Sequence, residues 1–402
     1  MLTQEIKDIA QKNADKMIEF RRDLHTHPEL SLKETRTAAR IAEELRKLDG
    51  IEVTEGVAGG TGVIGLLRGG AGEGKTVLLR ADIDALPIEE ESGVPFSSQN
   101  CGVMHACGHD GHTSWLLGSA MILSQLRDRI KGNVKFVFQP GEEGGGGGRM
   151  MVRESHVLEN PTVDAVFAAH AWPEVEAGHI EVAARSAFGF AGGFTIKVTG
   201  KGGHGSWPHE CIDPIAVANQ IYGGLQQIVS RRLHETSARV LSVCTIHSGP
   251  QDKSNIIPDC CTMTGTIRSD RREVMEEMKL EIKKVSEGIA EANGAHADVE
   301  TRSGEAVINT PEAVPFCINA ASKILGAENV AVDNMPHLGG EDFSEYITRV
   351  PGAYIFAGIA TDETRGKFGL HSSHFILEES MIPKVAAVFS QMAVDFLEKG
   401  SF

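Results

Sequence analysis

The segment from Met104 to Ser114, MHACGHDGHTS, gathers several chemically active side chains in eleven residues. Cys107 and His109 are two residues apart, so on an extended segment their side chains would point to the same side. Gly108, between them, would let the backbone pass close to a bound ion. Three roles are open for Cys107: a nucleophile paired with a histidine, half of a disulfide, or a metal ligand.

Further ionisable residues follow four apolar segments that predict strands. In chain order they are Asp82 and Asp84, Glu142 and Glu143, His170, and His371. Loops beyond the carboxyl ends of parallel strands converge, and ligands bind there. Together with Cys107 and His109, these residues offer thiolate, imidazole and carboxylate, which suit zinc and similar ions, whereas magnesium and calcium sites use oxygen ligands. The sequence therefore predicts a transition-metal site, with a nucleophilic cysteine as its rival.

Hydrophobic periodicity predicts the elements that position these residues. Apolar stripes at helical spacing predict helices over 4–24, 35–48 and 113–127 and near the C-terminus. Short β-branched runs between them predict strands. Near-continuous apolar strands that alternate with helices indicate an α/β fold, with a mostly parallel sheet flanked by helices on both faces.

Between residues 186 and 307 the predicted order changes to strand, helix, strand, strand, helix, strand. Asp213 is expected to cap the first of these helices and Asp270 the second. The βαββαβ order is a complete two-layer α+β unit. We therefore predict that 186–307 is a domain inserted into a first domain, which comprises residues 1–185 and 308–402.

Composition excludes several classes of protein. The net charge is -16, and the absence of a dominant basic cluster argues against a nucleic-acid partner. The N-terminus lacks the apolar core of a secretory signal, and no apolar run approaches the roughly 18 residues of a membrane span. Seven cysteines, an odd number, cannot all form disulfides. We expect a soluble cytoplasmic protein with free thiols and no membrane partner.

Ten motifs that cover nearly the whole chain resemble the two-metal aminoacylase and carboxypeptidase family. The resemblance is strongest to its branch of N-acyl-amino-acid amidohydrolases, which includes hippurate hydrolases, N-acetyl-amino-acid deacetylases and indoleacetyl-amino-acid hydrolases. The motifs are, in order, RRDLHTHPEL, RADIDALP, MHACGHDGH, FQPGEEGGGG, HAWP, GKGGHGSWPH with DPI, NIIPD, GTIRSD, GGEDF and LHSSHF.

This resemblance implies two divalent metal ions per subunit and a role for each matching residue. The metal ligands would be Cys107, which bridges the two ions, with His109, Glu143, His170 and His371. Zinc is the expected metal, and manganese, cobalt and nickel are also compatible with these ligands. Glu142 matches the general base, and Asp84 matches a carboxylate that orients a ligand. Asp82 and Asp110 are further candidates for such support.

The inserted domain contributes residues that would act on the substrate, and the resemblance makes it a lid or dimerisation domain. His204 matches a histidine that reaches the reacting carbonyl of a neighbouring subunit, so a homodimer or homotetramer is expected. Asn255 and Arg268 match positions that contact the substrate, although Arg268 is also compatible with a surface strand. The remaining motif residues, interpreted as supporting the fold, are His112 and Asp342, and His25, His27, His209 and His374.

The implied activity is hydrolysis of the amide bond of N-acyl-L-amino acids, by water activated between two ions with Glu142 as general base. Two alternatives are kept. A dipeptidase or carboxypeptidase would share the site and differ in pocket size, and a non-catalytic protein would bind an acylated amino acid. The family pattern is altered at Glu176, Gly141, Gly205 and Ser206, which bears on substrate preference and removes no ligand.

Overall fold

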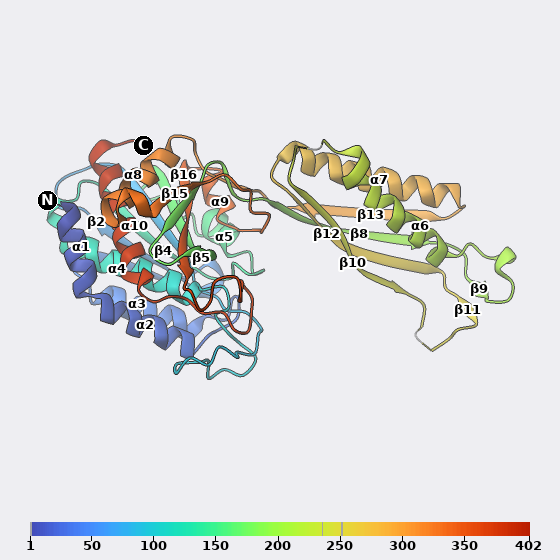
Figure 1. The fold of residues 1–402 in the computed structure, drawn as a ribbon, viewed down its shortest axis with the longest axis horizontal. Helices are drawn as coiled ribbons and strands as arrows, with labels where there is room; N and C mark the ends of the chain where they lie inside the picture. Colours follow the sequence, from blue (N-terminus) through green and yellow to red (C-terminus); the bar gives the residue numbers. More distant parts are fainter. Residues whose placement is uncertain (1, 235, 251) are drawn as a thin grey trace. The chain divides into compact units, whose positions relative to one another are not determined.

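The computed structural model describes residues 2–234, 236–250 and 252–402, which form two compact units. The first unit comprises the chain up to Ala187, with Val307–Met335 and Asp342–Phe402. The second comprises Phe188–Ala306 and the short segment Pro336–Glu341. Figure 1 follows the chain through both units by colour. The sequence pattern did not indicate that residues 336–341 group with the second unit.

An eight-stranded sheet forms the centre of the first unit, in the order β1-β2-β4-β3-β5-β16-β6-β15. Its strands are β1 (Ile51–Val57), β2 (Gly62–Arg68), β3 (Thr76–Asp82), β4 (Asn133–Gln139), β5 (Ala165–Glu176), β6 (Ile180–Ala183), β15 (Val330–Asp333) and β16 (Gly352–Ala360). The central strands β4, β3, β5 and β16 pair in parallel, whereas β1 with β2, β2 with β4, and β6 with β16 pair antiparallel. The predicted α/β class is confirmed, with the antiparallel pairs towards the sheet edges.

The larger helices of this unit are α1 (Leu2–Lys12), α2 (Ala14–Thr26), α3 (Thr35–Arg46), α4 (His109–Gln125), α8 (Ala313–Leu325) and α10 (Met381–Lys399). The prediction of one helix over 4–24 is wrong, because the chain forms two helices that meet at Asn13. The Asn13 side chain donates a hydrogen bond to the Ile9 carbonyl at 2.9 Å. Asparagine competes in this way with backbone hydrogen bonding, which favours a helix boundary.

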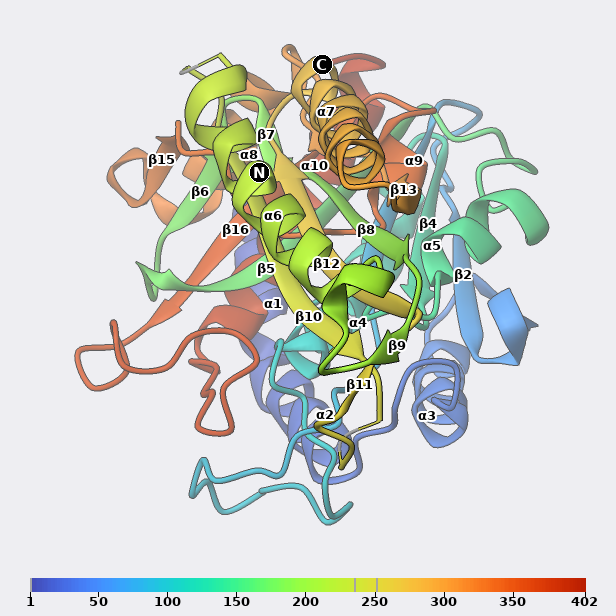
Figure 2. The ribbon, with the colours of Figure 1, turned by 90° about the vertical axis from the view of Figure 1, so that its right-hand side faces the viewer.

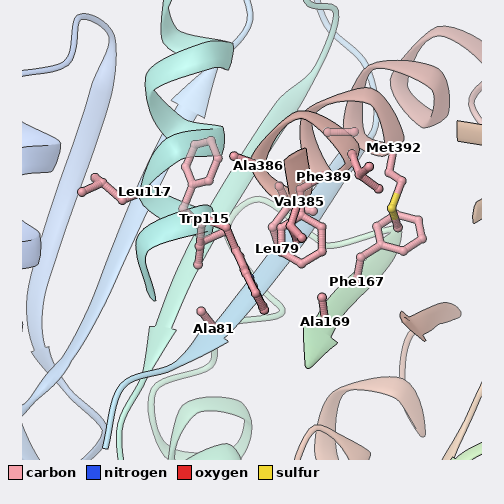
Figure 3. Close-up of a cluster of buried hydrophobic side chains, with 14 of the residues drawn as sticks. Leu79, Ala81, Trp115, Leu117, Phe167, Ala169, Val385, Ala386, Phe389 and Met392 are labelled. Carbon is pink, nitrogen blue, oxygen red and sulfur yellow. The ribbon is translucent and has the colours of Figure 1, made fainter. Parts of the chain in front are cut away.

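The alternation of side chains along β3 separates an apolar face from a polar one. Leu79 and Ala81 join a buried core with Trp115 of α4 and Phe389 of α10, as Figure 3 shows. Because successive strand residues point to opposite faces, Arg80 lies on the other side of the sheet. On that side Gln139 of β4 accepts hydrogen bonds from Arg80 at 3.1 Å and from Tyr346 of the short helix α9 (Ser344–Ile347) at 3.0 Å. The short helix α5 is Gly147–Arg149.

The second unit has its own core beneath two helices. Its sheet, in the order β10-β12-β8-β13, is antiparallel throughout, and α6 and α7 pack side by side on one face of it (Figure 2). These elements are β8 (Phe190–Thr199), α6 (Pro214–Gln227), β10 (Arg239–Ser248), β12 (Cys260–Ser269), α7 (Arg272–Ala292) and β13 (His296–Ser303). Asp213 caps α6 by accepting a hydrogen bond from the Ile215 amide at 2.8 Å. The prediction that Asp270 caps α7 is wrong, because the helix begins after Arg271, one residue further on.

Two small pairs of strands complete the fold: β7 (Ser186–Phe188) with β14 (Val307–Ile308), and β9 (Gly203–His204) with β11 (Ile256–Ile257). Short helical turns occur at η1 (Ala58–Gly60), η2 (Arg127–Arg129), η3 (Met150–Glu154), η4 (Pro208–Glu210), η5 (Ile228–Arg232) and η6 (Ala327–Asn329). All seven cysteines are free thiols. Within the described part of the chain, no helix has both the length and the apolar character needed to cross a membrane.

Candidate metal centre

Cys107 and His109 lie where an irregular connection between β3 and α4 ends. The expectation that they lie on an extended segment is wrong: Cys107 is in a turn and His109 is the first residue of α4. Gly108 makes this turn with φ of 85°, in the left-handed region that glycine adopts readily. The turn brings the donor atoms of Cys107 and His109 within 4.8 Å of each other, so the two side chains still converge.

Two groups of possible ligands meet at Cys107. One group contains Cys107, His109 and His170, and the other contains Cys107, Glu143 and His371, with all donor atoms of a group within 4.8 Å of one another. The Cys107 sulfur lies 3.4 Å from His170 Nε2, and His371 Nε2 lies 3.1 Å from Glu143 Oε1. The structure therefore brings together all the ligands that the sequence resemblance implied.

Hydrogen bonds orient two of the imidazole rings towards this cluster. His170 Nδ1 is 2.8 Å from the Ala171 carbonyl and donates to it, which leaves Nε2 facing Cys107. His109 Nδ1 similarly donates to the Asp84 carbonyl at 2.9 Å. His109 Nε2 is buried and has no hydrogen-bond partner among the described residues. A buried polar atom without a partner is costly, and mixed sulfur, nitrogen and oxygen donors suit zinc-like ions, so the residues present fit a metal centre.

Electrostatics distinguish a metal ligand from a nucleophile at Cys107. Burial, reinforced by the charges of Glu143 and Glu142, raises the pKa of the Cys107 thiol well above its usual range. Reactive cysteines instead have a lowered pKa, because the thiolate is the nucleophile. Burial lowers the pKa of His109, but the charge of Asp82 and the interactions with Cys107 and Asp84 together outweigh burial and raise that pKa well above normal. The site therefore favours positive charge and disfavours a free thiolate nucleophile.

Asp84 connects a ligand to the segment that carries the paired glutamates. Its Oδ1 lies 3.2 Å from His109 Nδ1, and its Oδ2 accepts hydrogen bonds from Ser31 Oγ at 2.6 Å and from the Glu143 amide at 3.0 Å. Burial raises the pKa of Asp84, but the hydrogen bonds to its charged form and the charge of His109 together outweigh burial and lower that pKa. Asp84 is thus ionised and in contact with His109 and with the backbone of Glu143.

His112 uses both ring nitrogens within the protein. Its Nδ1 lies 2.6 Å from Asp82 Oδ1 and donates a hydrogen bond to it. Its Nε2 accepts a hydrogen bond from the Ala171 amide at 2.9 Å. Burial lowers the pKa of His112, so the ring is neutral in this arrangement. Although Asp82, His109 and His112 also lie within 4.8 Å of one another, His112 has no free lone pair for an ion. It fits the supporting role expected from the sequence.

Glu142 is half-buried next to the cluster. One of its carboxylate oxygens lies within 4.8 Å of donor atoms of His109 and Glu143. The glycine-rich segment after these glutamates is held by Asp342, whose Oδ2 accepts the Gly148 amide at 2.7 Å. Asp342 therefore supports the segment that presents Glu142.

Arg80 was not singled out from the sequence, yet it links these supports. It is 1% exposed, and its guanidinium lies 2.6 Å from Asp82 Oδ2 and 2.9 Å from Asp342 Oδ1. A charged residue within a buried strand needs ionic partners, because unpaired buried charge is strongly destabilising. The arginine in the apolar run TVLLRAD was the signal that could have identified it.

The substrate-contacting residues expected from the resemblance lie in the second unit. His204 on β9 pairs with β11, and the adjacent Gly205 amide donates to the Asn255 carbonyl at 2.8 Å, so His204 and Asn255 are neighbours. Arg268 lies apart from them on β12, where it donates to the carbonyls of Gly192 and Ile267, each at 2.9 Å.

The remaining histidines have separate surroundings. His25 is buried beside Asp110, with 2.8 Å between His25 Nδ1 and Asp110 Oδ2. His27 Nδ1 donates to the Asp23 carbonyl at 2.9 Å, His209 is exposed, and His374 stacks on Phe368 with ring centroids 5.1 Å apart. Of these, only His25 belongs to a buried charged cluster.

Comparison with known proteins agrees with this centre. The family model described as Peptidase family M20/M25/M40 matches residues 78–395. The chain is 40% identical over 401 residues to thermostable carboxypeptidase 2 of Saccharolobus solfataricus, which covers 99% of this chain and 100% of that protein. It is 37% identical over 383 residues to N-acetylcysteine deacetylase of Bacillus subtilis, covering 95% and 97%.

A solved structure gives the same result. A Bacillus subtilis protein described as a dinuclear metal binding peptidase from the M20 family superposes with a TM-score of 0.82. It shares 35% sequence identity, and the match covers 96% of this chain and 99% of that one. The family resemblance found in the sequence motifs is confirmed.

Proposed function

Because the chain belongs to peptidase family M20/M25/M40, we propose that it hydrolyses the amide bond of N-acyl-L-amino acids with two divalent metal ions. The proposal is carried by Cys107, whose sulfur is a member of two groups of possible ligands within one cluster. Cys107 would therefore help to hold both ions. The deacetylase relative supports an acylated amino acid as substrate.

Five side chains would hold the two metal ions. The ligands would be Cys107, His109, Glu143, His170 and His371. Zinc is the first choice, and manganese, cobalt and nickel are compatible, since such ions share nitrogen and sulfur donors. Bound ions would supply Lewis-acid polarisation and water of lowered pKa.

Glu142 is proposed to move the proton. It would accept a proton from the attacking water as the water oxygen bonds to the amide carbon. It would then pass that proton to the leaving nitrogen as the C–N bond breaks, which yields a carboxylate and a free amino acid. Asp84 would keep His109 and the Glu143 segment in register during both transfers, through its contacts with each.

The second unit is proposed to complete the site as a lid and dimerisation domain. His204 would stabilise the negative charge that develops on the carbonyl oxygen of a neighbouring subunit's substrate. Asn255 and Arg268 would contact the substrate carbonyl or carboxylate. This assignment would make the protein a homodimer or homotetramer. A cytoplasmic location and small-molecule substrates are part of the same proposal.

A second candidate function is cleavage of short peptides by the same site. It is favoured by the 40% identity to a thermostable carboxypeptidase over nearly the whole chain. Both functions require Glu142 and the same ligands, and the size of the pocket distinguishes them. Retention of Glu142 and of the whole ligand set favours either enzyme over a non-catalytic binding protein.

Replacement of Glu142 by glutamine tests the mechanism. We expect the variant to keep its metal content and to lose about 10²- to 10⁴-fold in kcat, because a general base of this kind contributes that much. Metal analysis and hydrolysis should be measured on a panel of N-acyl amino acids and short peptides. Glu159→Gln, at an exposed site, is the control and should keep full activity. Unchanged turnover in Glu142→Gln would contradict the assignment, and the panel would reveal which substrate class is preferred.

A further inference from the structure

A second buried cluster of charges lies beside the metal centre and has no part in the proposed reaction. It consists of Arg21, His25, Glu90 and Asp110, which we call the buried quartet. Arg21 is 2% exposed, His25 is 1% exposed and Asp110 is fully buried, and the Glu90 side chain is 3% exposed. Charged groups are rarely buried this completely, so their arrangement calls for a physical explanation.

The quartet is closely paired. Arg21 Nε lies 2.6 Å from Asp110 Oδ2, and His25 Nδ1 lies 2.8 Å from the same oxygen. The other ring nitrogen of His25 lies 3.0 Å from Glu90 Oε1. Two carboxylates therefore face an arginine and an imidazole with both nitrogens occupied. Such ionic pairing offsets the buried charges, although Asp110 Oδ1 has no hydrogen-bond partner among the described residues, and removal of one partner would leave another charge uncompensated.

The four residues come from three different parts of the first unit. Arg21 and His25 are four residues apart on α2, so they share one face of that helix. Asp110 is in the first turn of α4 and directly follows the expected ligand His109. Glu90 lies in the irregular connection between β3 and α4, where it also accepts the Ser98 amide at 2.6 Å. The quartet thus ties α2 to both the connection and the start of α4.

That connection carries the metal-centre residues at its two ends. It runs from residue 83 to 108 without a helix or a strand longer than a single bridge, and it includes Asp84 and Cys107. Phe96 from its middle lies against Arg21, with 5.0 Å from the guanidinium carbon to the ring centroid. His105, two residues before Cys107, has its ring centroid 6.4 Å from that of His25. The contacts with α2 supply the order that secondary structure does not.

We propose that the buried quartet positions Cys107 and His109, and so determines how tightly the protein binds its metal ions. The inference rests on the proposed function, because it assumes that these two residues are ligands. Ligand geometry depends on surrounding groups, and loss of an outer partner commonly weakens metal binding by about 10- to 100-fold. A cluster that served stability alone would leave the metal affinity of the folded protein unchanged.

Glu90→Ala is the informative variant. It removes the contact between His25 of α2 and the connection from β3 to α4, and it leaves the Arg21–Asp110 pair in place. The full-length metal-free protein should be titrated with Co²⁺ in competition with a chelator. We expect a Co²⁺ affinity about 10- to 100-fold lower than that of the wild type, together with a weaker thiolate-to-cobalt absorption band from Cys107. Glu90→Gln keeps an acceptor for His25 and should recover most of the affinity.

Lys323→Met is the matched control, since it removes a 2.8 Å ion pair with Asp395 between α8 and α10 of the same unit. It should lower the melting temperature without changing cobalt affinity or absorption. Wild-type affinity and an unaltered cobalt band in Glu90→Ala would overturn this inference alone. A wild-type protein that binds no cobalt would overturn the proposed function and this inference with it.

Discussion

Burial decides the chemistry of Cys107 at the scale of the residue. A cysteine two residues from a histidine is equally compatible with a nucleophile and with a metal ligand. Burial raises the pKa of this thiol, and the sulfur lies 3.4 Å from an imidazole nitrogen whose ring is oriented by the Ala171 carbonyl. A neutral thiol among such donors is suited to lose its proton to a metal ion and poorly suited to attack a substrate.

Metal binding should therefore release protons and become tighter as the pH rises. Without metal, the pKa of Cys107 and the pKa of His109 are both raised well above normal, so both groups carry protons near neutrality. A metal ion must displace these protons, and its apparent association constant should increase by about tenfold per pH unit for each proton displaced. Titration calorimetry in buffers of different ionisation enthalpy would count them. An equal metal affinity across about pH 6 to 8 would show that metal binding does not displace protons from Cys107 and His109.

Helix α4 positions the centre at the scale of the element. Its first residue is His109, and the helix is buried between α2, α10 and the sheet. Gly118 marks the closest approach: a Cβ atom there would lie 2.6 Å from Met17 Sδ and 2.9 Å from Ala386 Cβ. The packing leaves no space for even a methyl group at this position, so the placement of His109 depends on the whole helix.

Two glycine substitutions separate packing from helix propensity. Gly118→Ala should destabilise the protein by about 1–3 kcal/mol, since overpacking forces neighbouring groups to move. Gly223→Ala on α6 would meet no atom within 4 Å, and it should instead stabilise by about 0.4–1 kcal/mol. Denaturant unfolding of the metal-free protein would measure both free energies. A Gly118→Ala protein as stable as Gly223→Ala would show that α4 can shift to accept the methyl group.

At the scale of the whole molecule, the residues of the proposed function are distributed over both units. The expected metal ligands and Glu142 belong to the first unit, whereas His204, Asn255 and Arg268 belong to the second. If residues of both units act on one substrate, the first unit of one subunit can be combined with the second unit of another subunit in an oligomer. The symmetry of a homodimer would then give each site one contribution from each copy.

Mixing two inactive variants tests this division. A Glu142→Gln subunit paired with a His204→Ala subunit would contain one intact site of two, if His204 serves its neighbour. After random exchange of subunits in an equal mixture, half of the dimers are mixed, and each mixed dimer has one active site of two. The mixture should therefore recover about a quarter of the wild-type specific activity. Activity assays should accompany proof of subunit exchange by mass-labelled protein. No recovery after complete exchange would mean that each subunit uses its own His204.

Sequence patterns determined much of this protein. The apolar runs TVLLRAD and NVKFVFQP predicted buried strands, and the structure has β3 and β4 at those residues. Such runs are informative because a strand buried on both faces needs nearly continuous apolar residues. The motif match indicated Cys107, Glu143 and three histidines as candidate ligands, and the fold brings these residues together. Helix boundaries were less predictable, since Asn13 divides a continuous apolar stripe and the start of α7 does not follow the nearest aspartate.

Only the tertiary structure decided which polar side chains pair with one another around the candidate centre. Arg80 pairs with Asp342, and Arg21 pairs with Asp110, across separations in sequence that no local pattern reports. His25, which sequence alone placed among structural histidines, faces two carboxylates in the buried quartet. Sequence periodicity records which face of an element is apolar, whereas the partner of a buried charge depends on which distant segments the fold brings into contact.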